Sequence, residues 1–198
     1  MRDFIEYYKW HLIFLLLVII CLVFAFMNMT TSEKPDLTIG YIGTDYVNVQ
    51  TFNDNKGEFE LLLRDADDNG NTTAEMYAYA VDLQADLDET LLEMIDSEGY
   101  QIIISTKKAF ENLEDKTVFI NAEEYVNLKG KKLSVLEDKK GNPFAVSLKD
   151  NDHMKKMGIL SSDDLYIAVS KAKADKNGDI PVTAKNGRNI AGYILGEE

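Results

Sequence analysis

The sequence predicts an α/β domain with a largely parallel sheet, preceded by one long apolar helix. Strand-like apolar runs alternate with helical stripes through the first half of the body, which is typical of α/β proteins. Hydrophobic residues make up 45% of the chain, which suits a packed core. The 198 residues are enough for one domain plus an appendage. We therefore expect one domain with a three-layer arrangement of helices and sheet, and an added β-hairpin.

The appendage is predicted from Leu12–Met27, sixteen consecutive apolar residues without a charge, glycine or proline. With its flanking residues, a helix here spans about 30 Å, the thickness of a bilayer core. The run is longer than the apolar part of a usual signal peptide, and no A-x-A cleavage site follows it. We expect an uncleaved transmembrane anchor at residues 12–29 that contacts the lipid bilayer. A buried core helix of a soluble protein is the alternative.

The flanks of the apolar run predict the topology. Arg2 and Lys9 give a slight positive-inside bias, so residues 1–11 are expected to form a short cytoplasmic segment. Residues 30–36 are predicted to be a polar linker, and residues 37–198 an extracellular, or more generally extracytoplasmic, domain. The predicted location is the cell membrane, crossed once. Beyond residue 33 the chain holds 31 acidic and 19 basic residues, so the domain carries most of the negative charge.

Three strands are predicted in the first half of the domain, as apolar or alternating runs. They are residues 37–43, 75–83 and 101–106. A helix is expected after each strand, because apolar residues there recur at helical spacing. These helices are residues 51–65, 85–98 and 107–113. Each connection is long enough for the crossover that parallel strands require.

The pattern changes in the second half. Residues 133–136 and 144–148 flank a polar loop that contains glycine, which predicts a β-hairpin. A further strand is predicted at residues 165–170, and a short helix at residues 189–195 closes the domain.

Several function classes are disfavoured by composition and by motif. The net charge of −13 argues against binding to a nucleic acid, which requires clustered Lys and Arg. One cysteine excludes an intramolecular disulfide, and no Cys/His cluster is present for zinc. No G-x-S-x-G, H-E-x-x-H, P-loop or G-x-G-x-x-G motif occurs, and His153 stands alone in a polar segment. We therefore expect a protein that is not an enzyme.

The order and spacing of several segments resemble a known family. The segments are DLTIGYIGTDY, FELLLRDADDNGNTTAEMYAYAV, LLEMIDSEGYQIIIST, GNPFAVSL and LYIAVS…NIAGYIL. They resemble bacterial extracellular solute-binding proteins of ABC transporters, and more closely the small membrane-anchored relatives with one lobe. The resemblance implies one lobe of a periplasmic-binding-protein fold. Only 50 residues follow Leu148, which leaves no room for a second lobe that would close over a ligand.

Candidate residues for a ligand or a partner follow the strands, because open α/β sheets bind ligands at the carboxyl ends of their strands. Two groups come after the first and third predicted strands, and two more residues lie near the hairpin. They are Gly43, Thr44, Asp45, Tyr46, Ser105, Thr106, Lys107, Asn142 and Phe144. Ordinary turns and helix N-caps are the alternative, since Thr44 and Ser105 suit N-cap positions.

The loop that begins at Asp65 resembles the start of a calcium-binding loop. Asp65, Asp67 and Asn69 supply oxygen ligands at positions 1, 3 and 5, and Gly70 follows at position 6. Met76 occupies position 12, where a bidentate glutamate is expected, so an Asx-rich turn is the alternative. Calcium is the one cofactor that the sequence suggests.

Three tyrosines also stand out, because they are spaced to form an aromatic surface. They are Tyr77, Tyr79 and Tyr100, and packing in the core or at half-exposed strand positions is the alternative.

These expectations combine into a membrane-anchored domain that binds or docks and does not catalyse. It is expected to be an accessory or recognition component of a transporter or of a surface complex, with a membrane or surface protein as partner. A free-standing sensor of a small polar ligand or of calcium is the alternative.

Overall fold

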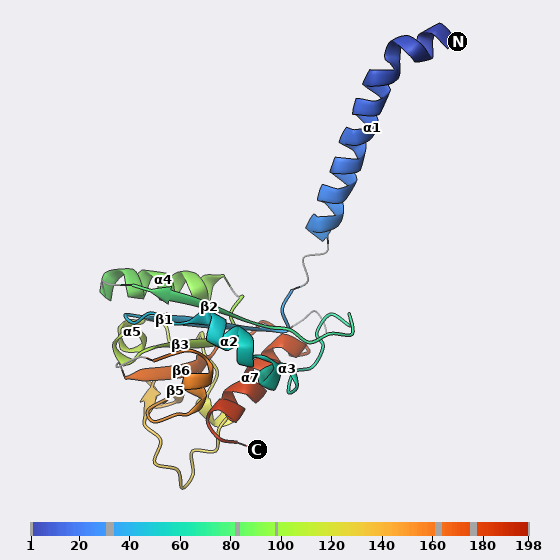
Figure 1. The fold of residues 1–198 in the computed structure, drawn as a ribbon. Coiled ribbons are helices and arrows are strands. Elements are labelled where there is room, and N and C mark those ends of the chain that lie inside the picture. Colours follow the sequence, from blue (N-terminus) through green and yellow to red (C-terminus); the bar gives the residue numbers. More distant parts are fainter. Residues whose placement is uncertain are drawn as a thin grey trace. The chain divides into compact units, whose positions relative to one another are not determined.

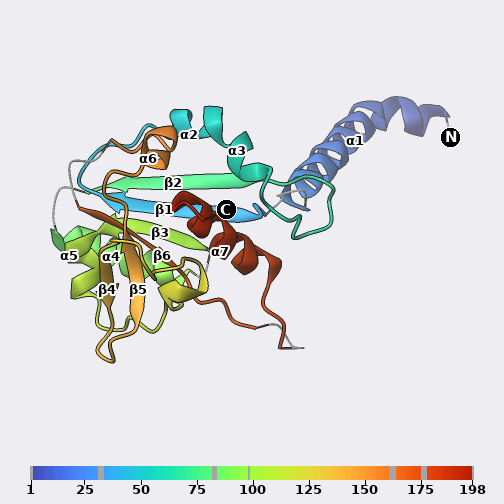
Figure 2. The same cartoon turned by 90° about the horizontal axis from the view of Figure 1, so that it is seen from below.

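The structure, a computed structural model, describes residues 2–30, 34–81, 84–97, 99–160, 164–174 and 178–197. The chain divides into two compact units, residues 1–34 and residues 35–198. The second unit holds a six-stranded sheet with helices on both faces (Figures 1 and 2). The α/β class expected from the sequence is confirmed.

The first unit is helix α1 (Arg2–Thr30), which includes the predicted anchor segment. Leucine, isoleucine, valine and phenylalanine follow one another here without glycine or proline, so nothing interrupts the helix. Most of its apolar side chains between Trp10 and Val23 are exposed. The predicted transmembrane helix is not found: among the residues described, no helix combines the length and the apolar character needed to cross a membrane.

The sheet has the strand order β2-β1-β3-β6-β5-β4. Its strands are β1 (Leu37–Gly43), β2 (Ala74–Ala80), β3 (Ile102–Thr106), β4 (Val135–Glu137), β5 (Pro143–Ser147) and β6 (Leu165–Val169). Strands β2, β1 and β3 are parallel, whereas β6 is antiparallel to β3, and the β6–β5 and β5–β4 pairs are also antiparallel. The sheet is therefore mixed, not largely parallel as predicted. Antiparallel neighbouring strands need no crossover helix between them. Strands β4, β5 and β6, in the second half of the domain, pair in this antiparallel way.

The helices differ from the predicted ones mainly at their ends. They are α2 (Val49–Asn55), α3 (Gly57–Glu60), α4 (Gln84–Asp96), α5 (Lys107–Asn112), η1 (Ala122–Glu124), α6 (His153–Lys156) and α7 (Val182–Ile194). The helix predicted over residues 51–65 is replaced by α2 and α3. Asn53, Asn55 and Gly57 are poor helix formers, so the segment breaks into two short helices.

Helix α7 begins seven residues before the predicted helix. Its first half looks polar in the sequence because it contains Asn186 and Gly187, yet both residues are buried. A Cβ atom on Gly187 would lie 2.8 Å from the Cβ of Gln101. Glycine at this position therefore allows α7 to pack closely against Gln101. Ile190 and Ile194 continue the buried side of the helix.

Two hydrophobic cores lie on the two faces of the sheet. One core contains Phe52 and Phe59, whose rings stack with centroids 5.7 Å apart, together with the buried side of α7. The other contains buried residues of α4 and α5 and an aromatic group that includes Phe110 and Phe144.

Candidate functional site

The carboxyl ends of β1 and β3 bring two predicted groups of residues to the same edge of the sheet. The strands are parallel, and Ile42 pairs with Ser105. Residues 43–46 and 105–107 therefore leave the sheet on one side. Tyr46 is 81% exposed, whereas the Ser105 hydroxyl is buried and has no hydrogen-bond partner among the described residues. Ligand binding at this edge remains a prediction.

Thr106 has a clear structural role at this edge. Its hydroxyl accepts a hydrogen bond from the Ala109 N–H at 3.3 Å and so caps α5. The Lys107 N–H donates to the Asp164 carbonyl at 3.0 Å, which joins this turn to the start of β6. Helix capping, one of the two alternatives open from the sequence, is what the structure shows for Thr106.

Asn142 and Phe144 do not join that edge. Strand β5 pairs antiparallel with β6, which pairs antiparallel with β3, so β5 runs parallel to β3 and begins at the opposite edge. Phe144 is 2% exposed and packs against Phe110 and Phe119, with ring centroids 6.0 and 5.7 Å away. The Asn142 side chain donates to Asp138 at 2.9 Å within the hairpin turn.

A cavity of about 980 Å³ lies beside the predicted edge. It is lined by residues 148–152 after β5, by part of α6, and by Asp164 and Leu165 at the start of β6. A second cavity, of about 1010 Å³, lies between α7 and the segment of residues 123–129. Neither cavity was predicted from the sequence, because segments that are distant along the chain come together to line each one.

Tyr77 and Tyr79 are exposed beside the partly buried Tyr100, and with Glu75 these residues form an aromatic surface that we call the tyrosine face. Strand alternation places Glu75, Tyr77 and Tyr79 on one side of β2, and Met76 and Ala78 on the other. Tyr77 is 45% exposed and Tyr79 is 39% exposed. Half-exposed strand positions, the alternative to a binding surface in the sequence, are what the structure shows for Tyr77 and Tyr79.

Hydrogen bonds hold the rings of the tyrosine face in place. The Tyr77 hydroxyl donates to Glu75 Oε2 at 2.7 Å, and this bond raises the pKa of Tyr77. The Tyr79 and Tyr100 hydroxyls are 3.1 Å apart, and the Tyr77 and Tyr100 rings meet edge to face at 5.9 Å. Burial is the main cause that raises the pKa of Tyr100. The phenols of Tyr77 and Tyr100 therefore remain protonated at neutral pH.

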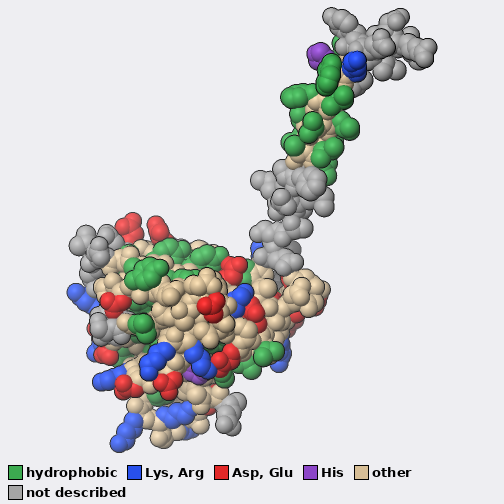
Figure 3. All heavy atoms as spheres, viewed as in Figure 1, with side chains coloured by type: hydrophobic (Ala, Val, Ile, Leu, Met, Phe, Trp, Pro, Cys, Tyr) green, Lys and Arg blue, Asp and Glu red, His purple; other side chains and the backbone are tan. Residues whose placement is uncertain are grey.

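The segment of the sequence that contains Tyr77, Tyr79 and Tyr100 is acidic. Residues 65–106 contain eleven Asp and Glu residues and no Lys, Arg or His. Strand β2 and helix α4 both belong to this segment. In Figure 3, exposed hydrophobic side chains appear on the upper part of the domain, at the level of β2 and α4 in Figure 1, and most Lys and Arg side chains in view lie lower.

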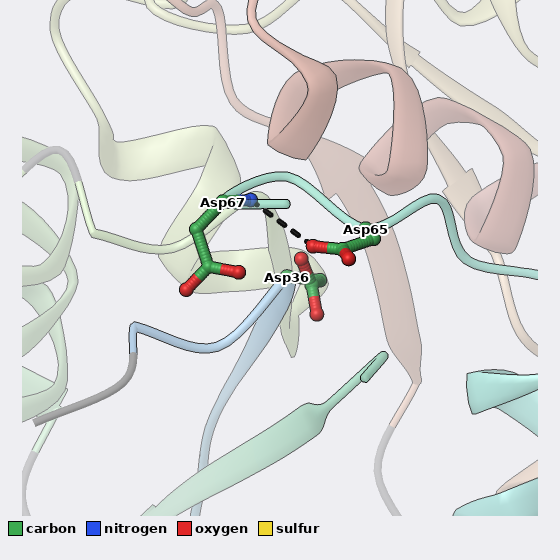
Figure 4. A group of neighbouring side chains, drawn as sticks. All are labelled: Asp36, Asp65 and Asp67. Atoms are coloured by element: carbon green, nitrogen blue, oxygen red, sulfur yellow. Dashed lines mark hydrogen bonds between the residues drawn. The ribbon is translucent and has the colours of Figure 1, made fainter. Parts of the chain in front are cut away.

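Three carboxylates come together at the other edge of the sheet, where β1 begins. Asp36, Asp65 and Asp67 each offer an oxygen within 4.8 Å of the others (Figure 4). Asp36 lies in the predicted linker, yet it is buried: its Oδ1 accepts from the Ala66 N–H at 2.6 Å and its Oδ2 from the Thr73 N–H at 2.8 Å. Asp65 and Asp67 were predicted from the sequence, whereas Asp36, 29 residues away from Asp65, was not.

Asn69, the third predicted calcium ligand, is not part of this group. Its side-chain amide donates to Asp67 Oδ2 at 3.1 Å, and its oxygen accepts from the Asn71 N–H at 2.8 Å. Asp65 accepts three backbone N–H groups, and the bond from Gly70 is the main cause that lowers the pKa of Asp65. The loop is therefore built as a series of Asx turns, with three carboxylates that could hold a cation.

A group of titratable residues joins three helices on the α7 side of the sheet. Glu58 in α3 pairs with Lys156 in α6, with Nζ 2.7 and 2.8 Å from the two carboxylate oxygens. Tyr193 in α7 donates a short hydrogen bond to Glu58, and its ring contacts the His153 ring at 4.7 Å between centroids. The hydrogen bond from Lys156 is the main cause that lowers the pKa of Glu58, and burial is the main cause that lowers the pKa of His153. The group holds α3, α6 and α7 together.

Comparison with protein-family models, with curated proteins and with solved structures found no match to this chain. The resemblance to one-lobed solute-binding proteins therefore remains a prediction from the order and spacing of the elements.

Proposed function

We propose that this chain is a membrane-attached docking domain of the one-lobed solute-binding type, which binds a protein partner and performs no catalysis. The observation that supports docking is the tyrosine face, where Tyr77 and Tyr79 of strand β2 remain partly exposed to solvent. Exposed aromatic surface is typical of sites where proteins bind one another.

Attachment to a bilayer is supported by α1. Its sixteen-residue apolar run and its exposed side chains present a surface that suits lipid better than water. As proposed, α1 keeps the domain near a membrane or surface protein, where it acts as an accessory or recognition component.

Purification from gently solubilised membranes of the cells that make the protein tests this function. We expect the full chain to elute as a complex with one other protein in fixed ratio, and to stay with the membrane after an alkaline wash. A variant with Leu16→Lys and Ile20→Lys should be released by the wash. Elution of the wild-type chain as a monomer without a partner would contradict the docking function.

Calcium sensing is the second candidate, and one observation favours it. Asp36, absent from the predicted loop, supplies a buried carboxylate next to Asp65 and Asp67. Each Asp36 oxygen has a further lone pair besides the one that accepts an N–H group. Ca²⁺ prefers several such oxygens.

A thermal melt of the full chain with CaCl₂ tests this second candidate, because a ligand that binds only the folded state raises its stability. We expect an increase in Tm that KCl at equal ionic strength does not reproduce. Asp36→Asn should abolish the increase, and Asp68→Asn, in the same loop but outside the group, should keep it. Equal responses to both salts would argue against a calcium site.

A further inference from the structure

We infer that the tyrosine face binds an extended, Lys/Arg-rich polypeptide segment of the docking partner, placed along strand β2. This inference rests on the proposed docking function and adds the surface and the chemistry of its partner. Three independent features of β2 and α4 support it: the charge, the ring surfaces and the free edge of the sheet.

The charge around the face selects a cationic partner. The eleven acidic residues of segment 65–106 are not balanced by a single basic residue in that segment. Among them, Glu75, Glu89 and Glu93 are exposed on β2 and α4. These three carboxylates attract opposite charge over a distance of about 8 Å at physiological salt.

The same charge disfavours symmetric pairing of two copies through this face. Two such faces would bring Glu75, Glu89 and Glu93 of both copies together, which like-charge repulsion makes unfavourable. The occupant is therefore expected to be a different chain.

The rings give the face its chemistry. Both strand tyrosines already use their hydroxyl groups, Tyr77 with Glu75 and Tyr79 with Tyr100. What remains accessible is ring surface in a fixed orientation. The face of an aromatic ring attracts a guanidinium or ammonium group, and an arginine can also stack on it.

The unpaired outer edge of β2 favours a partner segment in an extended conformation. The Val81 N–H donates to the Gly43 carbonyl on β1 at 2.9 Å. Because backbone groups alternate in direction along a strand, the N–H and C=O groups of Met76, Ala78 and Ala80 point away from β1. The Ala74 N–H is already bonded to Glu60 Oε1 at 3.2 Å, so the available edge begins at Met76.

No strand among the described residues pairs with β2 on this outer side. An extended segment can therefore add to the sheet here, with alternate side chains directed over the tyrosine rings.

Binding of a synthetic peptide to the full chain in detergent micelles tests the inference. The probe is a fluorescein-labelled octapeptide that alternates Arg with Thr or Val, and the control peptide carries Glu at each Arg position. We expect fluorescence anisotropy to show salt-sensitive binding of the Arg peptide and none of the Glu peptide. Equal binding of both peptides, or of neither, would overturn the inference.

Matched variants assign the binding to this surface. Replacing both rings (Tyr77→Ser with Tyr79→Ser) should weaken binding of the Arg peptide about tenfold or more, as expected for the loss of two cation–π contacts. Glu89→Gln with Glu93→Gln should weaken it and reduce its salt dependence. Glu111→Gln with Glu114→Gln should change it less than about twofold, since surface substitutions outside a contact have little effect.

The copurification and peptide-binding results together show whether this inference fails or the docking function on which it rests fails. If the Tyr77/Tyr79 double variant still purifies with the partner and still binds the Arg peptide, docking stands and the assignment to this face is wrong. If the chain binds the peptide through these residues but no partner is found in membranes, the docking function fails instead. Sedimentation without peptide that shows self-association through Tyr77 and Tyr79 would identify a second copy as the occupant and overturn the inference.

Discussion

The side-chain amide of Asn186 donates a hydrogen bond of 3.1 Å to the backbone carbonyl of Asp36, 150 residues earlier in the chain. The same side chain bonds to the backbone of Arg64 twice, accepting from its N–H at 2.9 Å and donating to its C=O at 2.8 Å. Asn186 is fully buried. One amide therefore ties α7 to the start of β1 and to the loop that carries Asp65 and Asp67.

We expect Asn186→Ala to lower the free energy of unfolding by about 2–4 kcal/mol, because it leaves buried backbone groups of Arg64 and Asp36 without partners. Urea denaturation of the full chain measures the effect. Asn189→Ala is the control, since Asn189 is exposed on the same helix. Equal effects of the two substitutions would show that the buried amide has no special role.

Phe144 is predicted to contribute to stability through the core. We expect Phe144→Ala to lower the free energy of unfolding by about 3–5 kcal/mol, because it removes a buried ring that packs against Phe110 and Phe119. Tyr46→Ala, at an exposed position, should change it by no more than about 0.5 kcal/mol. A near-neutral Phe144→Ala that loses binding of a partner would instead support the role expected from the sequence.

Two glycines, Gly57 in α3 and Gly187 in α7, should respond to alanine with opposite signs. Gly187→Ala places a methyl group 2.8 Å from the Cβ of Gln101, so we expect a loss of about 1–3 kcal/mol. Gly57 has no atom within 4 Å of a new Cβ, so Gly57→Ala should add about 0.4–1 kcal/mol by restricting the unfolded chain. Thermal melts of the two variants and of the wild type show whether each substitution raises or lowers stability.

Stability should fall with pH below neutrality, with His153 as one cause. Burial lowers the folded-state pKa of His153 from the ordinary value of 6.5, and Nδ1 has no hydrogen-bond partner among the described residues. The unfolded chain therefore binds a proton more readily than the folded one. The contribution of neutral His153 is fully present above the unfolded pKa and is lost as pH falls through the folded pKa.

Substitution of the ring tests this pH dependence. His153→Phe keeps an aromatic contact with Tyr193 and cannot titrate, so the decline in Tm from pH 7 to pH 5 should become smaller. Glu58, with a lowered pKa, should still cause a decline at lower pH, as its carboxylate is protonated and its bond with Lys156 weakens. A profile between pH 7 and 5 that is unchanged in His153→Phe would exclude His153 as the cause.

The elements that the sequence predicted well have local causes. The apolar run from Leu37 to Gly43 and the run from Ile102 to Thr106 are strands within a residue of their predicted ends. The leucine stripe of α4 and the polar loop of the β4–β5 hairpin likewise depend on neighbouring residues. Helical and strand periodicities are properties of short stretches, so they can be recognised without the rest of the fold.

The start of α7 and the role of Asp36 could not be recognised in this way. Asn186 looks like a loop residue until Arg64 is placed beside it, and Asp36 looks like part of a linker until the loop of Asp65 folds over it. Both are polar residues that are buried because distant backbone groups satisfy their hydrogen bonds.

The sequence by itself determined the α/β class, the apolar run of α1, the acidic segment 65–106 and the local turns, because composition and periodicity are properties of neighbouring residues. Only the tertiary structure decided that the sheet is mixed and that Phe144 is a core residue at the opposite edge from Thr106. It also decided that Tyr77 and Tyr79 lie exposed beside the partly buried Tyr100. Strand direction and register depend on pairings between residues far apart in the chain, and these pairings determine which side chains meet and which remain exposed.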